Sequence, residues 1–234
     1  MIDHNLYASP VQASQALITH ILEAMDKEPE RPFTIALSGG TTPATLFEVW
    51  EREYAAYTPW PRIYFYWVDE RCVPPGDDQS NFGLAHRLLL GKVGIPASHY
   101  YRIVGEGAPE EEAQQYSSIV KTTVPTMDGV PVFDFVLLGI GEDGHTSSIF
   151  PDHQELLTAG EPYEVSVNPY NKTSAYMHDG RPLIEARHTC FLVTGENKCS
   201  ILKEILDKNK EGVYPASYIW HHARNPQLYA SLVS

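Results

Sequence analysis

Cysteines are few in this sequence of 234 residues, and none of them belongs to a C-x-x-C pair. The three residues, Cys72, Cys190 and Cys199, favour neither a disulfide framework nor a zinc knuckle. No apolar run approaches the ~18 residues that a membrane span needs. The first residues, MIDHNLYASPVQASQ, do not follow the basic-then-apolar layout of a signal peptide. We therefore expect reduced thiols and a cytoplasmic location, with no membrane partner.

Positive charge is also scarce, since 17 Lys and Arg stand against 30 Asp and Glu, for a formal net charge of −13. Nucleic acids and anionic membranes are bound through Lys and Arg that neutralise phosphates, so neither is an expected partner. An anionic small molecule would need a local group of cations or backbone N–H donors. The content of 43% hydrophobic and 20% charged residues is ordinary for a soluble globular enzyme. The length predicts one domain spanning residues 1–234.

Apolar periodicity predicts alternating helices and strands. The predicted helices are 9–28, capped by Ser9 with Pro10 at its first position, then 43–54 within the stretch 42–54, 81–90, 108–124, 196–209 and 225–232. The predicted strands are 33–38, 62–70, 100–104, 133–140, 189–195 and 216–220, and residues 168–182 are expected to be irregular. Such alternation predicts a three-layer α/β/α fold with a mainly parallel, Rossmann-like central sheet.

Three polar loops directly follow three predicted strands. They are SGGTTP at 38–43, DERCVPPGDDQSN at 69–81 and GIGEDGHTSS at 139–148. In an open parallel sheet, ligands bind outside the carboxyl ends of the strands. We therefore expect the three loops to converge on one site.

The first loop has the composition of an anion site. Its glycines permit close backbone approach, its hydroxyls can donate hydrogen bonds, and a helix start beside it offers free N–H groups. These residues are Ser38, Gly39, Gly40, Thr41 and Thr42. No G-K-[ST] follows, so the loop is not a Walker A motif. A plain strand-to-helix turn is the alternative.

The third loop contains a G-x-G-x-x-G pattern at Gly139, Gly141 and Gly144. A dinucleotide turn is disfavoured, because Glu142 and Asp143 within the pattern would repel a pyrophosphate. Instead, we expect the glycines to bring Asp143 and His145 over the sheet. A carboxylate next to an imidazole orients it and raises its basicity, which suits a general base acting on water. A solvated loop histidine is the alternative.

The second loop begins with Asp69, Glu70 and Arg71 at a strand end. Arg71 has a planar fork of donors that could bind an anion or a carbonyl. Alternatively, it pairs with one of the two neighbouring carboxylates and only stabilises the loop. No set of histidines has a spacing that predicts a metal site.

Together, LSGGTTP, DERCVPPGDDQSN, GIGEDGHTSSIFP and FLVTGENKCSIL resemble the 6-phosphogluconolactonase family, within the superfamily shared with glucosamine-6-phosphate deaminase. The resemblance covers most of the chain, from about Leu37 to Trp220. It implies hydrolysis of 6-phospho-D-glucono-1,5-lactone to 6-phosphogluconate, without a metal or nucleotide cofactor. The implied partner is thus a phosphosugar lactone, and the protein itself is expected to be a monomer or a small homo-oligomer.

The resemblance also implies roles for individual residues. His145 would be the general base, Asp143 would orient it, and Arg71 would bind substrate near the reacting carbon. The 6-phosphate would be held by the 38–42 loop and Lys198, and Asp69 is included among the candidate substrate-binding residues. The deaminase pattern carries a glutamate just before the proline of this motif, where the present chain has Phe150, and this disfavours a deaminase.

The chain departs from the family pattern at one phosphate-binding position. Relatives usually have an arginine on the strand before IEARH, and the aligned position here is near Ala175. Lys172 or Arg181 is a candidate substitute. The departure leaves open a third function, a sugar-phosphate-binding protein without catalytic activity.

Overall fold

A computed structural model describes residues 6–158, 160–170, 174–178 and 180–233. Its central feature is a five-stranded sheet with strand order β10-β9-β6-β1-β2. Every neighbouring pair in this sheet is parallel. The strands are β1 (Phe33–Leu37), β2 (Ile63–Trp67), β6 (Phe135–Leu138), β9 (His188–Thr194) and β10 (Pro226–Ser231).

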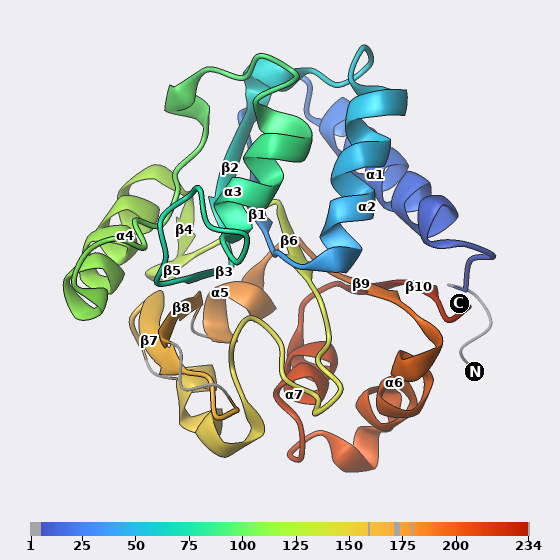
Figure 1. The fold of residues 1–234 in the computed structure, drawn as a ribbon, viewed down its shortest axis with the longest axis vertical. Helices are drawn as coiled ribbons and strands as arrows, with labels where there is room; N and C mark the ends of the chain where they lie inside the picture. Colours follow the sequence, from blue (N-terminus) through green and yellow to red (C-terminus); the bar gives the residue numbers. More distant parts are fainter. Residues whose placement is uncertain (1–5, 159, 171–173, 179, 234) are drawn as a thin grey trace.

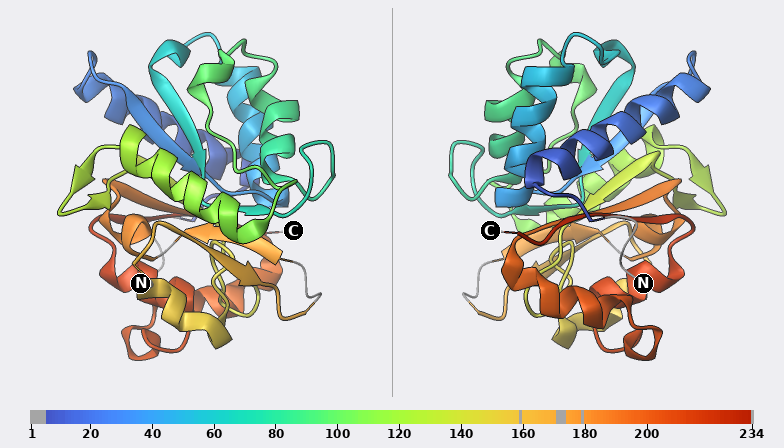
Figure 2. Two further views of the ribbon diagram at one scale, coloured as in Figure 1. Left: turned by 90° about the vertical axis from the view of Figure 1, so that its left-hand side faces the viewer. Right: turned by 90° about the vertical axis from the view of Figure 1, so that its right-hand side faces the viewer.

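Helices cover both faces of this sheet (Figures 1 and 2). One side carries α1 (Pro10–Lys27), α2 (Thr41–Val49) and α3 (Asn81–Ala85); the other carries α6 (Cys199–Leu206) and α7 (Pro215–His222). The remaining α-helices are α4 (Pro109–Thr123) and α5 (Gly180–Glu185). Segments of π-helix, Trp50–Tyr54 and His86–Leu90, extend α2 and α3. The predicted three-layer α/β/α fold with a parallel sheet is confirmed.

The elements form where the sequence pattern is strongest. All residues of β1 and β6 are buried, as expected for central strands that are covered on both faces and read as continuous apolar runs. The first helix begins as predicted, because Pro10 fits its first position and the Ser9 hydroxyl accepts a hydrogen bond of 3.2 Å from the Gln12 N–H. The helix α2 begins at Thr41, two residues before the predicted start at Pro43, since Gly40 already takes the capping position.

A second, antiparallel sheet lies beside the first. It has the order β3-β8-β7 and consists of β3 (Asp69–Arg71), β8 (Ser174–His178) and β7 (Tyr163–Val167). The predicted strand 62–70 is therefore two strands, because the chain leaves the central sheet after Val68 and joins this one. The segment 168–182 was wrongly expected to be irregular, since β8 and the start of α5 lie within it; its residues 171–173 and 179 fall outside the described part. The strands β4 (Thr126–Met127) and β5 (Val130–Pro131) form a short hairpin.

Three predicted elements are wrong. Residues 216–220 lie in the helix α7 and not in a strand, whereas 226–231 form the strand β10 and not a closing helix. Residues 100–104 form no strand, because Tyr100 makes only an isolated bridge with Phe65. Each of these segments is short, and short apolar runs do not distinguish a helix from a strand by period alone.

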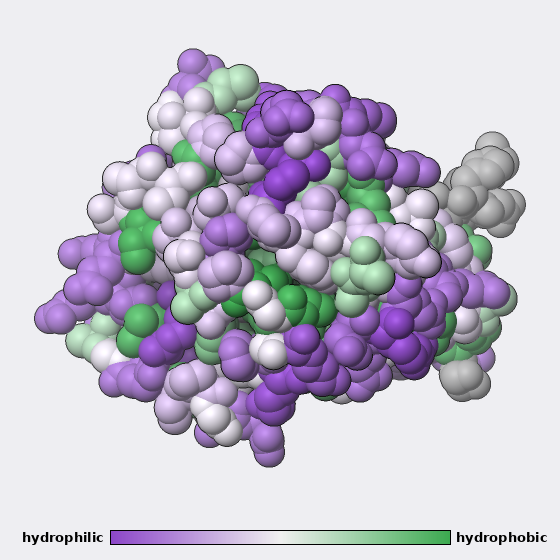
Figure 3. Space-filling model, turned by 90° about the horizontal axis from the view of Figure 1, so that it is seen from above, coloured by the Kyte–Doolittle hydropathy of each residue, from purple (hydrophilic) through white to green (hydrophobic). Residues whose placement is uncertain are grey.

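The surface is mostly hydrophilic on the face seen in Figure 3, where hydrophobic residues form small areas. In the described part of the chain, no helix has the length and apolar character needed to cross a membrane.

Candidate active site

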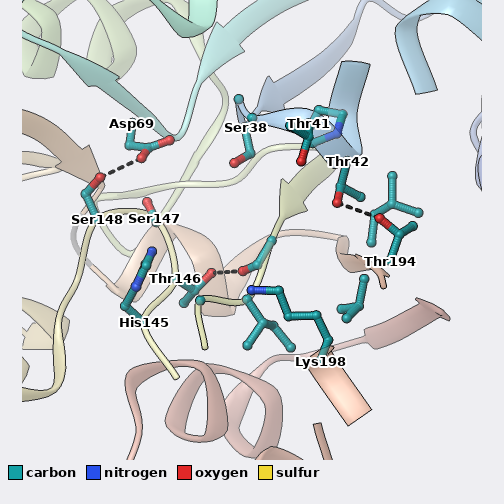
Figure 4. Close-up of a pocket in the computed structure, with 18 of the residues that line it drawn as sticks. Ser38, Thr41, Thr42, Asp69, His145, Thr146, Ser147, Ser148, Thr194 and Lys198 are labelled. Carbon is teal, nitrogen blue, oxygen red and sulfur yellow. Dashed lines mark hydrogen bonds between the residues drawn. The ribbon is translucent and has the colours of Figure 1, made fainter. Parts of the chain in front are cut away.

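A cavity of about 260 Å³ opens at the carboxyl edge of the central sheet. It is lined by the loops that follow β1 and β6, by the end of β9 with Lys198 beyond it, and by Asp69 and Arg71 of β3 (Figure 4). All strands of this sheet are parallel, so these loops leave it at the same edge, next to the point between β1 and β6 where the chain order reverses. The three loops singled out in the sequence thus meet at one cavity.

Most of the predicted site residues line this cavity. They are Ser38, Gly39, Gly40, Thr41, Thr42, Asp69, Arg71, His145 and Lys198. Asp143 does not line it but lies directly behind His145. Its Oδ1 is 2.6 Å from Nδ1 of His145 and also accepts the backbone N–H of that residue at 3.2 Å. The predicted carboxylate–imidazole pair is therefore formed at the edge of the cavity.

The Asp143 carboxylate is held in its ionised form. Partial burial raises the pKa of Asp143, but hydrogen bonds from His145 and Tyr170, with the attraction of the imidazole, outweigh it and leave the pKa below its usual range. An ionised carboxylate only accepts hydrogen bonds, so Nδ1 of His145 carries the proton. Nε2 then has a free lone pair, and among the described residues no hydrogen bond to it is found. This arrangement suits a general base.

Gly141 is required by this pair and not by a dinucleotide. A Cβ at this position would overlap the ring of His145 and the carboxylate of Asp143. The backbone N–H of Gly141 also donates to the His145 carbonyl at 2.8 Å, which closes the loop. The interpretation of the glycine pattern as a turn that places Asp143 and His145 agrees with this geometry.

The opposite wall of the cavity offers donors for an anion. Gly40 has a φ of 101°, a conformation that favours glycine, and it turns the chain into α2. The N–H groups of Thr41 and Thr42 belong to the first turn of this helix, which carries partial positive charge. The Lys198 side chain points toward the same space (Figure 4). The start of this helix and the Lys198 ammonium together form a wall of donors that suits an anion, and we call it the anion-binding wall.

Arg71 and Asp69 make different contacts from those considered in the sequence. The Arg71 guanidinium donates to the Gln79 carbonyl at 2.8 Å and lines the cavity, and it forms no ion pair with Glu70 or Asp69. Asp69 is buried and accepts hydrogen bonds from Ser148 and Asn81. Its carboxylate therefore contributes to the loop structure even though it borders the cavity.

Glu70 stabilises the second loop. Its carboxylate accepts hydrogen bonds from the backbone N–H groups of Arg71, Asn81 and Phe82 and from the Ser80 hydroxyl. Burial raises the pKa of Glu70 although these bonds act in the opposite direction. Glu70 fixes the start of α3 relative to β3, and so holds the backbone that carries Arg71.

Sequence reasoning missed several cavity residues. The hydroxyl residues Thr146, Ser147, Ser148 and Thr194 also line it. Thr194 shares a hydrogen bond of 2.7 Å with Thr42, which joins the end of β9 to the start of α2 (Figure 4). The HTSS run after the glycines was a local signal for the first three, whereas nothing near Thr194 in the sequence indicates its partner.

The position expected to carry the family arginine has no cation. Ala175 is buried in β8 and is paired with Arg71 on β3, so Arg71 is the guanidinium beside this position. The candidate substitute Arg181 donates to the Gly160 carbonyl and does not line the cavity. Lys172 lies outside the described residues.

Comparison with known proteins identifies the family. The model of the family glucosamine-6-phosphate isomerases/6-phosphogluconolactonase matches residues 8–229. A protein of Treponema pallidum named 6-phosphogluconolactonase is 39% identical over 171 residues, which are 73% of this chain and 71% of that protein. The structure of 6-phosphogluconolactonase from Trypanosoma cruzi matches with a TM-score of 0.85 and 26% identity, over 97% of this chain and 93% of that one.

A monomeric glucosamine-6-phosphate deaminase has the same fold, with a TM-score of 0.79 over 96% of this chain and 95% of that one, but only 16% identity. The resemblance expected from the four motifs is confirmed. The chain belongs to the family of glucosamine-6-phosphate isomerases and 6-phosphogluconolactonases.

Proposed function

We propose that this protein is a 6-phosphogluconolactonase that hydrolyses 6-phospho-D-glucono-1,5-lactone to 6-phospho-D-gluconate. The observation that carries the proposal is the Asp143–His145 pair, which faces the same cavity as the anion-binding wall formed by the first turn of α2 and Lys198. The proposal is supported by relatives that carry this name and match most of the chain.

In the proposed reaction, Nε2 of His145 takes a proton from a water molecule as the water oxygen attacks C1 of the lactone. The bond between C1 and the ring oxygen then breaks, and the imidazolium returns the proton to that oxygen. A well-placed general base contributes about 10²–10⁴ in rate. Because lactones already hydrolyse in water without a catalyst, this gain and the positioning of the substrate can suffice.

The phosphate and the reacting carbon have separate binding groups in this proposal. The 38–42 loop and Lys198 bind the 6-phosphate, and the Arg71 guanidinium, held by the Gln79 carbonyl, binds near C1.

Phe150 favours a lactonase over a deaminase. Its side chain is buried and its ring centroid is 4.7 Å from that of His145. A phenyl group at this place cannot transfer a proton, whereas the deaminase pattern has a glutamate there. It limits the movement of the imidazole by packing against it.

The test is a direct assay with freshly generated 6-phosphogluconolactone. We expect acid release well above the spontaneous rate, and we expect a chelator to leave the rate unchanged, since the proposed steps need no metal. Release of ammonia from glucosamine 6-phosphate would instead indicate a deaminase. Binding of 6-phosphogluconate without turnover of the lactone would indicate a non-catalytic sugar-phosphate-binding protein. The cytoplasmic location stays a prediction, and so does the oligomeric state, a monomer or a small homo-oligomer.

A further inference from the structure

Tyr170 contacts the outer oxygen of the Asp143 carboxylate. Its hydroxyl donates to Oδ2 of Asp143 at 2.6 Å, while Oδ1 of the same carboxylate meets Nδ1 of His145 at 2.6 Å. Both oxygens are therefore engaged, one by the phenol and one by the imidazole. These hydrogen bonds link Tyr170 through Asp143 to His145. Tyr170 belongs to none of the sequence motifs and has no role in the reaction proposed above.

The Tyr170 side chain is exposed but anchored. Although 71% of its surface is accessible, its ring lies edge-on to that of Phe150 with centroids 6.2 Å apart. Phe150 in turn contacts His145. The backbone N–H of Tyr170 donates to the side-chain carbonyl of Asn168 at 2.9 Å. A water molecule could replace the phenol as a donor, but it would not have this fixed position.

The phenol keeps its proton over the working pH range. The hydrogen bond to Asp143 raises the pKa of Tyr170, with smaller contributions from desolvation and from the charges of Asp143 and Asp152. A protonated phenol can only donate to an ionised carboxylate at this contact. The direction of the bond is thus constant while the imidazole changes its protonation state.

We propose that Tyr170 is a positioning residue that holds the Asp143 carboxylate against Nδ1 of His145 and thereby orients the imidazole for proton transfer. The inference rests on the proposed function of the site. Tyr170 acts through Asp143 and does not line the cavity, so it is not expected to bind substrate. Without the phenol, the carboxylate can rotate about its side-chain bonds, and its contact with the imidazole weakens.

The test variant is Tyr170→Phe, which removes the hydroxyl and keeps the ring. We expect kcat to fall about threefold to tenfold and KM to change by less than about twofold, since a lost hydrogen bond to an exposed charged group has an effect of this order. Weaker support of the imidazolium also moves the acid-side midpoint of the kcat/KM profile to lower pH. Tyr57→Phe is the matched control, because Tyr57 is 79% exposed and is not among the residues that line the cavity. It should match the wild type.

Adding Tyr170→Phe to an Asp143→Asn variant separates positioning from direct action. If Tyr170 works through the carboxylate, the second change should alter kcat by less than about twofold in that background. An unchanged kcat in the single variant, a midpoint that moves to higher pH, or an equal loss of kcat in the Asp143→Asn background would each overturn the inference. A rise in the midpoint would mean that the phenol competes with the imidazole for the carboxylate.

An NMR titration of the His145 imidazole in the wild type and in Tyr170→Phe keeps this inference separate from the proposed function. The midpoint should be lower in the variant, and identical titrations would overturn the inference even if the wild type hydrolyses the lactone. If the wild type shows no turnover, the proposed function fails, and the titration still decides whether Tyr170 holds the pair together.

Discussion

Two serines in the loop that carries His145 adopt a conformation that is unfavourable for residues with a Cβ. Ser147 and Ser148 have φ values of 50° and 55°, in the left-handed region, which costs roughly 1–2 kcal/mol for each residue. Both hydroxyls are buried and bonded. Ser147 donates to the Val68 carbonyl at 2.9 Å, and Ser148 donates to Oδ2 of Asp69 at 2.6 Å. These bonds offset the strain and join the loop of His145 to the ends of β2 and β3.

Substitutions at Ser147 can separate the strain from the hydrogen bond. Ser147→Ala and Ser147→Gly both remove the bond to Val68, but only alanine keeps the unfavourable left-handed conformation. We expect the glycine variant to have a free energy of unfolding about 1 kcal/mol higher than the alanine variant. Chemical denaturation of the two proteins measures the difference. An alanine variant as stable as the glycine variant would contradict the claim of strain at this position.

The parts of the site that could be predicted from the sequence are those formed by residues that are close together in the chain. Asp143 and His145 are two positions apart, and SGGTTP forms a single turn between a strand and a helix. Tyr170 could not be predicted, because its partner Asp143 lies 27 residues away, and Ser148 is 79 residues from Asp69. Such contacts depend on how the two sheets lie against each other, which local patterns do not encode.

At the scale of elements, α1 contacts the central sheet through a pair of histidines. The ring of His20 is 4.7 Å from that of His188 and 4.9 Å from that of Phe135, and its Nδ1 meets the Tyr229 hydroxyl. Burial lowers the pKa of His188 to about 4, and the charges of His20 and Lys27 act in the same direction. Burial also lowers the pKa of His20. Helix and sheet therefore meet through two neutral imidazoles.

This contact predicts a dependence of stability on pH. In the unfolded chain, a histidine gains its proton near pH 6.5, whereas His188 in the fold gains it only near pH 4. Its stabilising contribution is therefore complete above about pH 6.5, is lost as the pH falls toward 4, and changes no further below that. Relative to His188→Asn, the wild type should lose on the order of 1–2 kcal/mol of unfolding free energy between pH 7 and pH 4.5. Parallel curves for the two proteins would contradict this prediction, and His86→Asn, at an exposed histidine, serves as the control.

Helices and strands were predicted correctly where they are long or fully buried. The 18 residues of α1 carry both a cap and a clear apolar period, and β1 and β6 are fully buried runs. Near the C-terminal end, a strand was predicted where the helix α7 lies, and a helix was predicted where the strand β10 lies. The strand β10 exists because it pairs with β9, for example Leu228 with Phe191, and that pairing is not visible in residues 225–232. Pro226 is tolerated because it is the first residue of an edge strand.

At the scale of the whole molecule, the order of the strands in the central sheet determines where the positively charged groups lie. The protein carries a formal net charge of −13, yet the cavity is bordered by Arg71, Lys198 and the first turn of α2. The parallel strands place these groups and His145 at one edge. A net negative charge disfavours adventitious binding of polyanions, while these local cations would favour one small anion at the proposed site. That residues 1–234 form one domain stays a prediction.

The central claim is that His145 is the base that activates water. Its most direct test is the rate of 6-phosphogluconolactone hydrolysis by His145→Ala, compared with the wild type after subtraction of the spontaneous reaction. Our account predicts a fall in kcat of about 10²–10⁴, with the melting temperature and the affinity for 6-phosphogluconate retained. A variant that hydrolyses the lactone as fast as the wild type would contradict the account.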